Sequence, residues 1–474
     1  MVDILDQDAH VLAGLIRDKE LSAEELMRAT LARIEAVNSS VNAIISLRDA
    51  EACLADARAA DAMENKGPLH GLPVAIKDLA NAAGLPTSFG SPLFADFIAP
   101  KDDLMVARMK AAGAIVIGKT NTPEFGLGSH TFNPVHGATR NPYDLNRSAG
   151  GSSGGAAVAL ATGMMPIADG SDMMGSLRNP GAWNNVYGLR PTYGLVPSDM
   201  PGDAFLHQLA VAGPMGRCPQ DVAMLLDVQA GLHSDDPHSY VQAPSAPQLA
   251  GDIKGMRIGW LGDWGGAYPM EEGVLDTCEG ALSHFEALSA KVEKLPAPFP
   301  TEKIWEAWVG LRAWANAGGK AAFYNDPAQR GLLKEDAIWE IETGMALTAM
   351  DVHRLSVIRS QWYAKLIALF GEYDALLLPS AQVWPFPVEW KSPETIAGQA
   401  MDTYHRWMEI VIPVSLVGVP CVNIPAGFSA AGLPMGMQLF GPRMSDAKLL
   451  RIAQRWHEAT EFKDRKPDLA ALSR

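Results

Sequence analysis

Residues 150–155 read Gly-Gly-Ser-Ser-Gly-Gly, and an alanine-rich segment at 156–162 predicts a helix directly after them. The block belongs to a longer stretch, 137–197, that is rich in Gly, Ser, Asn and Pro, poor in charge and without regular periodicity. Long irregular stretches inside compact domains usually carry function. We therefore expect the chemistry of this chain to lie in or beside this stretch.

Apolar runs on both sides of the stretch predict an α/β fold. Residues 73–76 and 114–117 are expected to form short buried strands, with a helix between them at 106–112. This strand–helix–strand order is typical of a sheet covered by helices. Helices are also expected over 8–38, over 51–64 and over most of 305–407, and later strands at 257–261, 376–379 and 421–425.

The composition is that of a soluble globular protein. Lys and Arg total 39 against 54 Asp and Glu, a formal net charge of −15 that argues against a nucleic-acid binder, because such proteins need clustered basic residues. A hydrophobic share of 48% supplies a large core. Early acidic residues do not fit a signal peptide, and no apolar run reaches the ~20 residues of a transmembrane helix. The chain is therefore expected to be cytoplasmic.

Four cysteines, Cys53, Cys218, Cys278 and Cys421, lie far apart in the sequence. None belongs to a C-x-x-C pair, the spacing typical of zinc and redox sites. We expect them to be buried as small apolar side chains, without a metal site or a disulfide framework.

Two literal matches to catalytic motifs are interpreted as structural. Residues 113–120 match the phosphate-loop pattern G-x-x-x-x-G-K-T, but the middle residues are apolar and mostly β-branched, which favours a buried strand. Residues 151–155 match G-x-S-x-G, yet no strand-like run precedes them as an α/β-hydrolase requires. Such a hydrolase also needs a histidine, and the candidates His405 and His457 have no distinctive setting. A nucleotide site and an α/β-hydrolase are therefore both disfavoured.

Three segments carry side chains suited to nucleophilic chemistry. Lys77 ends the strand at 73–76, where burial lowers the pKa of an amine; a solvated lysine is the structural alternative. Ser152 and Ser153 precede a helix, where capping is the alternative role. Residues 170–180 contain a turn whose successive N–H groups can form an anion nest, with a purely structural turn as the alternative.

Together these segments resemble the amidase signature family, and the resemblance runs through most of the chain. The Ser/Gly block is long and specific, and the spacings from Lys77 to Ser152 and from Ser152 to Ser176 are similar to those of the family. Further similar motifs are Gly118-Lys-Thr-Asn-Thr-Pro-Glu124, Gly137-Ala-Thr-Arg-Asn-Pro142, Gly188-Leu-Arg-Pro-Thr-Tyr-Gly194 and Gly432-Leu-Pro-Met-Gly-Met-Gln-Leu439.

The resemblance implies an α/β fold with a large mixed central sheet covered by helices on both faces. It implies one amidase domain over residues 1–474. The signature core lies at about 65–230, and a helical, tryptophan-rich region at about 300–410 is expected to face the substrate.

The resemblance also implies the roles of the site residues. Ser176 matches the nucleophile, Ser152 the bridging serine that follows a cis peptide bond, and Lys77 the general base. A serine hydroxyl is a poor nucleophile until a base removes its proton, and a neutral lysine can do so through a serine relay. Supporting positions are matched by Ser153, Asp172 and Arg178.

The backbone N–H groups of Met173, Met174, Gly175 and Ser176 match the oxyanion hole of the family. The family usually has Thr-Gly-Gly-Ser or a similar run of small residues here. A methionine at 174 disfavours the positive φ that glycine accepts. Either the backbone at Met174 lies in an ordinary region or the oxyanion hole has shifted.

The reaction implied is hydrolysis of a carbon–nitrogen bond through an acyl-serine, without a metal or an organic cofactor. We expect an apolar or aromatic amide or carbamate as substrate, no nucleic-acid or membrane partner, and leave a homodimer open. The alternative is a glutamine-hydrolysing subunit that supplies ammonia to a tRNA amidotransferase. The apolar expectation rests on adaptable Met173 and Met174 and on eight tryptophans. They are Trp305, Trp308, Trp314, Trp339, Trp362, Trp384, Trp390 and Trp407.

Overall fold

Eight strands form the main sheet of the computed structural model, which describes residues 3–63, 67–199 and 202–473. Their order across the sheet is β12-β11-β13-β17-β16-β9-β10-β8. β11 pairs in parallel with β12 and β13 and the other neighbours pair antiparallel, so the sheet is mixed, as expected. In chain order the strands are β8 (Ile167–Asp172), β9 (Tyr187–Arg190), β10 (Val211–Gly216), β11 (Arg257–Trp260), β12 (Lys291–Lys294), β13 (Ala375–Pro379), β16 (Cys421–Phe428) and β17 (Pro434–Phe440).

A separate three-stranded sheet holds the strands expected at 73–76 and 114–117. Its order is β1-β3-β2, with β1 at Ile44–Ile45, β2 at Pro73–Lys77 and β3 at Ile115–Thr120. β3 continues as a buried strand through the Gly-Lys-Thr of the phosphate-loop match, which confirms the structural interpretation of that motif. The remaining strands form short hairpins: β4 (Phe132–Asn133), β5 (Gly137–Ala138), β6 (Arg140–Asn141), β7 (Asp144–Ser148), β14 (Thr395–Ile396) and β15 (Gln399–Ala400).

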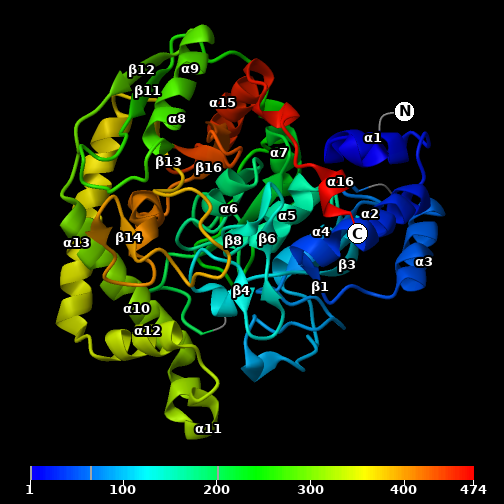
Figure 1. The fold of residues 1–474 in the computed structure, drawn as a ribbon, viewed down its shortest axis with the longest axis horizontal. Helices are drawn as coiled ribbons and strands as arrows, with labels where there is room; N and C mark the ends of the chain where they lie inside the picture. The colour runs from blue at the N-terminus through cyan, green and yellow to red at the C-terminus, as the bar shows by residue number, and fades with distance from the viewer. Residues whose placement is uncertain (1–2, 64–66, 200–201, 474) are drawn as a thin grey trace.

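Helices cover both faces of the main sheet. α5 (Gly154–Ala161) and α6 (Arg178–Trp183) lie on one side, and α7 (Pro219–Gln229), α8 (Val274–Ala281) and α15 (Asp446–Ala459) on the other (Figure 1). The other helices are α1 (Ala9–Arg17), α2 (Ala23–Val41), α3 (Ala50–Asp61), α4 (Leu104–Ala111), α9 (Ser283–Ala287), α10 (Thr301–Asn325), α11 (Pro327–Arg330), α12 (Glu335–Met345), α13 (Ala349–Phe370), α14 (Ile412–Ser415) and α16 (Leu469–Leu472).

The segment 8–38, expected to be helical, forms two helices instead of one. α1 ends at Arg17, and Lys19 follows with a left-handed φ of 62°. α2 then begins at the capping box of Ser22 and Glu25, which satisfies backbone donors at its first turn. The helix expected at 51–64 is α3, and residue 64 lies outside the described residues.

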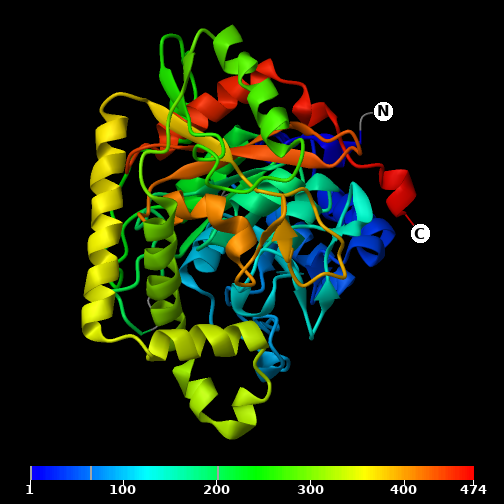
Figure 2. The same ribbon diagram turned by 60° about the vertical axis from the view of Figure 1, so that its left-hand side comes forward.

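The tryptophan-rich region is helical only in its first two thirds. α10 and α13 run side by side, and α12 crosses their ends (Figure 2). After Phe370 the chain enters β13 and irregular segments, so the expectation of helix up to 407 is wrong there. Burial of a strand, not helical periodicity, accounts for the apolar run of β13.

The stretch 137–197 is more regular than expected, since it contains β7, α5, β8, α6 and β9. Its small residues let backbones touch. A Cβ on Gly155 would lie 2.4 Å from the backbone nitrogen of Asn121, and one on Gly188 would lie 2.2 Å from the carbonyl oxygen of Leu177. Glycine here serves close packing and not the flexibility that its frequency suggested.

Candidate active site

Lys77 is a buried lysine at the carboxyl end of β2. Its side chain is 1% exposed, and Nζ donates to Ser152 Oγ and Ser153 Oγ, each at 2.8 Å. A third contact runs to Ser171 Oγ at 3.0 Å. Burial lowers the pKa of Lys77 to about 7, although the carboxylates of Asp169 and Asp172 oppose this effect. The amine is therefore partly neutral near pH 7, and a neutral amine can accept a proton from a serine.

Asp169 fixes the backbone at this lysine. The Lys77 backbone N–H donates to Asp169 Oδ1 at 3.1 Å, which joins β2 of the small sheet to β8 of the main sheet. Burial raises the pKa of Asp169 to about 6, against the lowering effect of that N–H and of the Lys119 and Lys77 charges. The sequence analysis did not single out Asp169, because a buried carboxylate beside a Gly-Ser turn has no local signature.

The serine block is held from three sides at the start of α5. The Gly151–Ser152 peptide bond is cis, as the resemblance implies. Ser129 Oγ donates to the carbonyl oxygen of Gly151 at 2.5 Å, and the Ser153 N–H donates to the carbonyl oxygen of Ser176 at 3.3 Å. The last contact places the serine block and the Ser176 loop directly side by side.

The loop that carries Ser176 is organised by a buried ion-pair network. Asp172 accepts from Arg178 Nε and Nη2, both at 3.0 Å, and from Arg190 Nη1 at 3.2 Å. Burial alone would raise the pKa of Asp172, but the two guanidinium groups outweigh it and hold that pKa well below its usual range. Asp172 therefore stays ionised. Arg190 belongs to the Gly188–Gly194 motif, so the resemblance contained a signal for it that was not used.

The methionines before Ser176 adopt ordinary backbone conformations. Among the described residues, positive φ in this loop occurs at Gly175, with φ 82°, and at neither methionine. The Gly175 N–H, expected among the oxyanion-hole donors, donates instead to Asp172 Oδ1 at 2.9 Å. Within the part of the chain that the structure describes, the N–H groups of Met173, Met174 and Ser176 have no such acceptor. Three of the four expected donors are thus open to a ligand.

Two cavities meet at this loop. The larger, of about 360 Å³, is lined by Lys77, Asp169, Ser171 and Met173, and further out by apolar side chains and Tyr193. The smaller, of about 140 Å³, is lined by Ser152, Ser176, Ser171, Met173 and Met174 on one side. Its opposite side is formed by Phe125, Arg312, Asn316, Lys320 and Met408.

None of the eight tryptophans lines either cavity, so the expectation that some would do so is wrong. Trp308, Trp362 and Trp407 are fully buried in the hydrophobic core. Trp314 comes nearest in the packing, with its ring 4.4 Å from that of His207, which lines the larger cavity. The tryptophans stabilise the helices α10 to α13 against the sheet, which is where their large apolar area is best buried.

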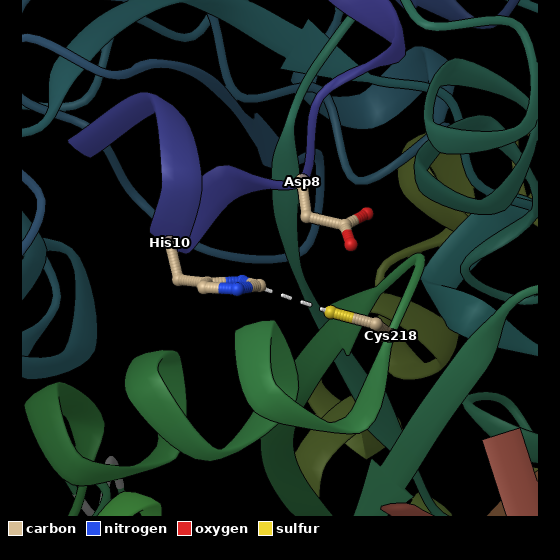
Figure 3. A group of neighbouring side chains, drawn as sticks. All are labelled: Asp8, His10 and Cys218. Carbon is tan, nitrogen blue, oxygen red and sulfur yellow. Dashed lines mark hydrogen bonds between the residues drawn. The ribbon is translucent and has the colours of Figure 1, made fainter. Parts of the chain in front are cut away.

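A second group of reactive side chains joins the N-termini of α1 and α7. Asp8, His10 and Cys218 place their ligand atoms within 4.8 Å of one another (Figure 3). His10 Nδ1 is already bonded to Asp221 Oδ1 at 2.7 Å, and burial raises the pKa of the Cys218 thiol. The group is thus organised as a hydrogen-bonded link between two helices. All four cysteines are free and buried, as expected.

The comparisons with known proteins agree with this geometry. A sequence model described as Amidase matches residues 25–450. The chain belongs to the amidase family. An acylamidase of Rhodococcus erythropolis is 35% identical over 473 residues, which cover 96% of each chain. The glutamyl-tRNA(Gln) amidotransferase GatA-type component of Nitrosococcus oceani is 33% identical over 96% of this amidase and 98% of its own length.

Solved structures extend the likeness to the whole fold. A bacterial aryl acylamidase of the amidase signature family superposes with a TM-score of 0.91 at 26% identity, covering 97% of each chain. A 6-aminohexanoate cyclic dimer hydrolase superposes with a TM-score of 0.87 at 26% identity, covering 98% of this amidase. The protein is therefore a hydrolase that cleaves carbon–nitrogen bonds in amides. Within its described residues no helix has the length and apolarity to cross a membrane.

Proposed function

We propose that this amidase hydrolyses small-molecule amides through an acyl-enzyme on Ser176, with Ser152 as proton relay and Lys77 as general base. The observation that carries the proposal is the buried Lys77 Nζ, 2.8 Å from Ser152 Oγ, with a pKa near 7. Such an amine can take a proton at neutral pH without a histidine.

The proposed acylation step moves one proton through two groups. Neutral Lys77 Nζ accepts the Ser152 hydroxyl proton while Ser152 Oγ accepts that of Ser176. Ser176 Oγ attacks the amide carbon, and the N–H groups of Met173, Met174 and Ser176 itself stabilise the oxyanion. Each such donor is typically worth about 3–4 kcal/mol in the transition state.

Collapse of the tetrahedral intermediate needs the proton again. It returns through Ser152 to the leaving nitrogen, because an amide anion is a poor leaving group. The carbon–nitrogen bond breaks, the amine or ammonia departs, and an ester to Ser176 remains. Water then attacks this ester with Ser152 and Lys77 again accepting the proton, and the acid is released.

For the substrate we propose an amide with an apolar or aromatic part, or a carbamate, that lies in the larger cavity. Leu79, Met105, Tyr193, Val196 and Leu209 supply apolar surface there. The likeness to an acylamidase and to an aryl acylamidase supports this class. The tryptophans do not, since they lie in the core.

The second candidate is glutamine hydrolysis for a tRNA amidotransferase. It is supported by the 33% identity to the amidotransferase component of Nitrosococcus oceani and by the polar side of the smaller cavity. The purified protein alone should decide between the two in a hydrolysis screen of glutamine, anilides, aliphatic amides and aryl carbamates. Best activity on anilides or carbamates supports the proposal, and best activity on glutamine refutes its substrate class.

The relay has its own test. Lys77→Ala should reduce activity on an anilide more than on an ester with the same acyl group, because only the anilide needs its leaving group protonated. Steady-state kcat/KM on the matched pair measures the difference. Equal losses on both substrates would contradict a role of the relay as general acid.

A further inference from the structure

We propose that the smaller cavity binds a carboxylate, or a similarly anionic group, of the amide substrate through Lys320 and Asn316, with Arg312 beside them. The inference rests on the proposed function, since it concerns the substrate of the same site. It differs from that function in requiring a charged group at a stated place.

The cations of this cavity lie opposite the serines. Lys320, Asn316 and Arg312 come from successive turns of one face of α10, and they share the cavity lining with Ser152 and Ser176. α10 lies against α12, so the two helices form this wall together (Figures 1 and 2). A group bound to the wall would belong to the same ligand whose carbonyl meets Ser176.

Arg312 is largely neutralised by its neighbours. Its Nη1 lies 2.5 Å from Glu340 Oε1, and its Nη2 donates to the hydroxyl of Tyr404 at 2.7 Å. Tyr404 in turn donates to Glu340 Oε1 at 2.7 Å. Arg312 Nε is buried and has no hydrogen-bond acceptor among the described residues. The pair therefore contributes an open donor but little net charge.

Lys320 supplies the charge that remains. Its Nζ donates to Asn316 Oδ1 at 2.8 Å and lies 5.7 Å from the centre of the Phe125 ring. Within the described part of the chain it forms no ion pair. Asn316 Nδ2 donates to Glu340 Oε2 at 3.2 Å, which orients the amide oxygen toward Lys320. A half-buried ammonium without a carboxylate, at the end of a substrate cavity, is a site for an anion.

The size of the cavity limits the group it can take. Its volume of about 140 Å³ is close to that of a cavity known to hold benzene, about six non-hydrogen atoms. A short aliphatic arm that ends in a carboxylate has that size. Larger acids are excluded by Phe125 and Met408, which narrow the cavity.

The test compares substrates that differ in one terminal group. N-glutaryl-4-nitroanilide ends its acyl arm in a carboxylate where N-pentanoyl-4-nitroanilide ends in a methyl group. A second pair places the charge on the amine side: the pentanoyl amides of 4-aminobenzoate and of 4-toluidine. We expect kcat/KM to be at least about tenfold higher for the carboxylate in one pair, as a charge-assisted hydrogen bond allows. The pair that shows the preference identifies which half of the substrate enters the cavity.

Variants then assign the preference to Lys320. Lys320→Met should abolish it and leave the neutral substrates within about twofold, and Lys320→Arg should retain much of it. Lys303→Met, an exposed position on the same helix, is the matched control and should change neither pair. Thermal unfolding checks that each variant folds, and the substrate comparison on the wild type does not depend on any variant.

The outcomes separate the inference from the proposed function. Hydrolysis of the neutral anilides without any preference for a carboxylate refutes the inference and leaves the function standing. A preference that survives Lys320→Met also refutes it. If neither neutral nor charged anilides nor esters are hydrolysed, the proposed function itself fails.

Discussion

The pH dependence of hydrolysis tests the role of Lys77 most directly. An ordinary lysine, with a pKa near 10.4, is neutral in about one molecule in two thousand at pH 7. With its pKa lowered to about 7, about half of the Lys77 amines are neutral at that pH, roughly a thousandfold more. Since the base acts in its neutral form, kcat/KM should rise about tenfold per pH unit below 7 and level off above about pH 8.

Asp169→Asn provides the perturbation. The buried carboxylate stabilises the Lys77 ammonium, so its removal should move the midpoint of the profile to lower pH. The asparagine oxygen can still accept the Lys77 backbone N–H, which keeps β2 in place. Asp235→Asn, at an exposed position, is the matched control and should leave the midpoint unchanged.

The assay is kcat/KM on an uncharged 4-nitroanilide from pH 5.5 to 9.5, because this parameter reports the free enzyme. A wild-type midpoint near 10 would mean that Lys77 is not desolvated in solution. A midpoint that Asp169→Asn leaves in place, or moves upward, would refute the assignment of the titrating group to Lys77.

Three further outcomes are expected. Ser176→Ala should lower kcat by about 10⁴-fold or more, and a serine-directed phosphonate should modify the wild type on the peptide that contains Ser176 and no other, as mass spectrometry can check. Arg178→Met should lower the free energy of unfolding by about 3 kcal/mol or more in urea titrations, because Asp172 keeps a buried charge with one partner fewer; a loss below 1 kcal/mol would contradict this. His10→Gln should destabilise the protein at pH 6 and much less at pH 9. Burial lowers the pKa of His10, but the bond to Asp221 leaves it raised, so its contribution is present below the unfolded-state pKa and lost as pH rises through the folded one; an equal loss at both pH values would contradict this.

The local parts of the fold could be predicted from the sequence. Strands such as β2 and β3 are continuous apolar runs, and their pattern does not depend on distant residues. The segments around Lys77, Ser152 and Ser176 could be identified because their motifs are contiguous and specific. Their meeting in space could be expected only through the resemblance, since no periodicity connects them.

The walls of the site could not be predicted. Lys320 lies within a long helix whose sequence resembles any amphipathic helix, and only the packing of α10 brings it opposite Ser176. The tryptophans led to a wrong expectation for the same reason, because burial in the core and exposure to a cavity use the same residue type. The Gly175 N–H was expected to be open, but the side chain of Asp172 folds back and accepts from it.

The backbone contacts of the glycine-rich stretch have a consequence for how the enzyme fails under heat. Gly155 lies against the backbone of Asn121 beyond β3, and Gly188 lies against Leu177 beside the nucleophile loop. The same contacts that join the two sheets therefore also assemble the catalytic groups, with no separate flexible loop between them. Local opening of this region cannot spare activity while the core persists. Inactivation and loss of the tertiary circular-dichroism signal should then follow one curve on heating, as in a device that has no working intermediate.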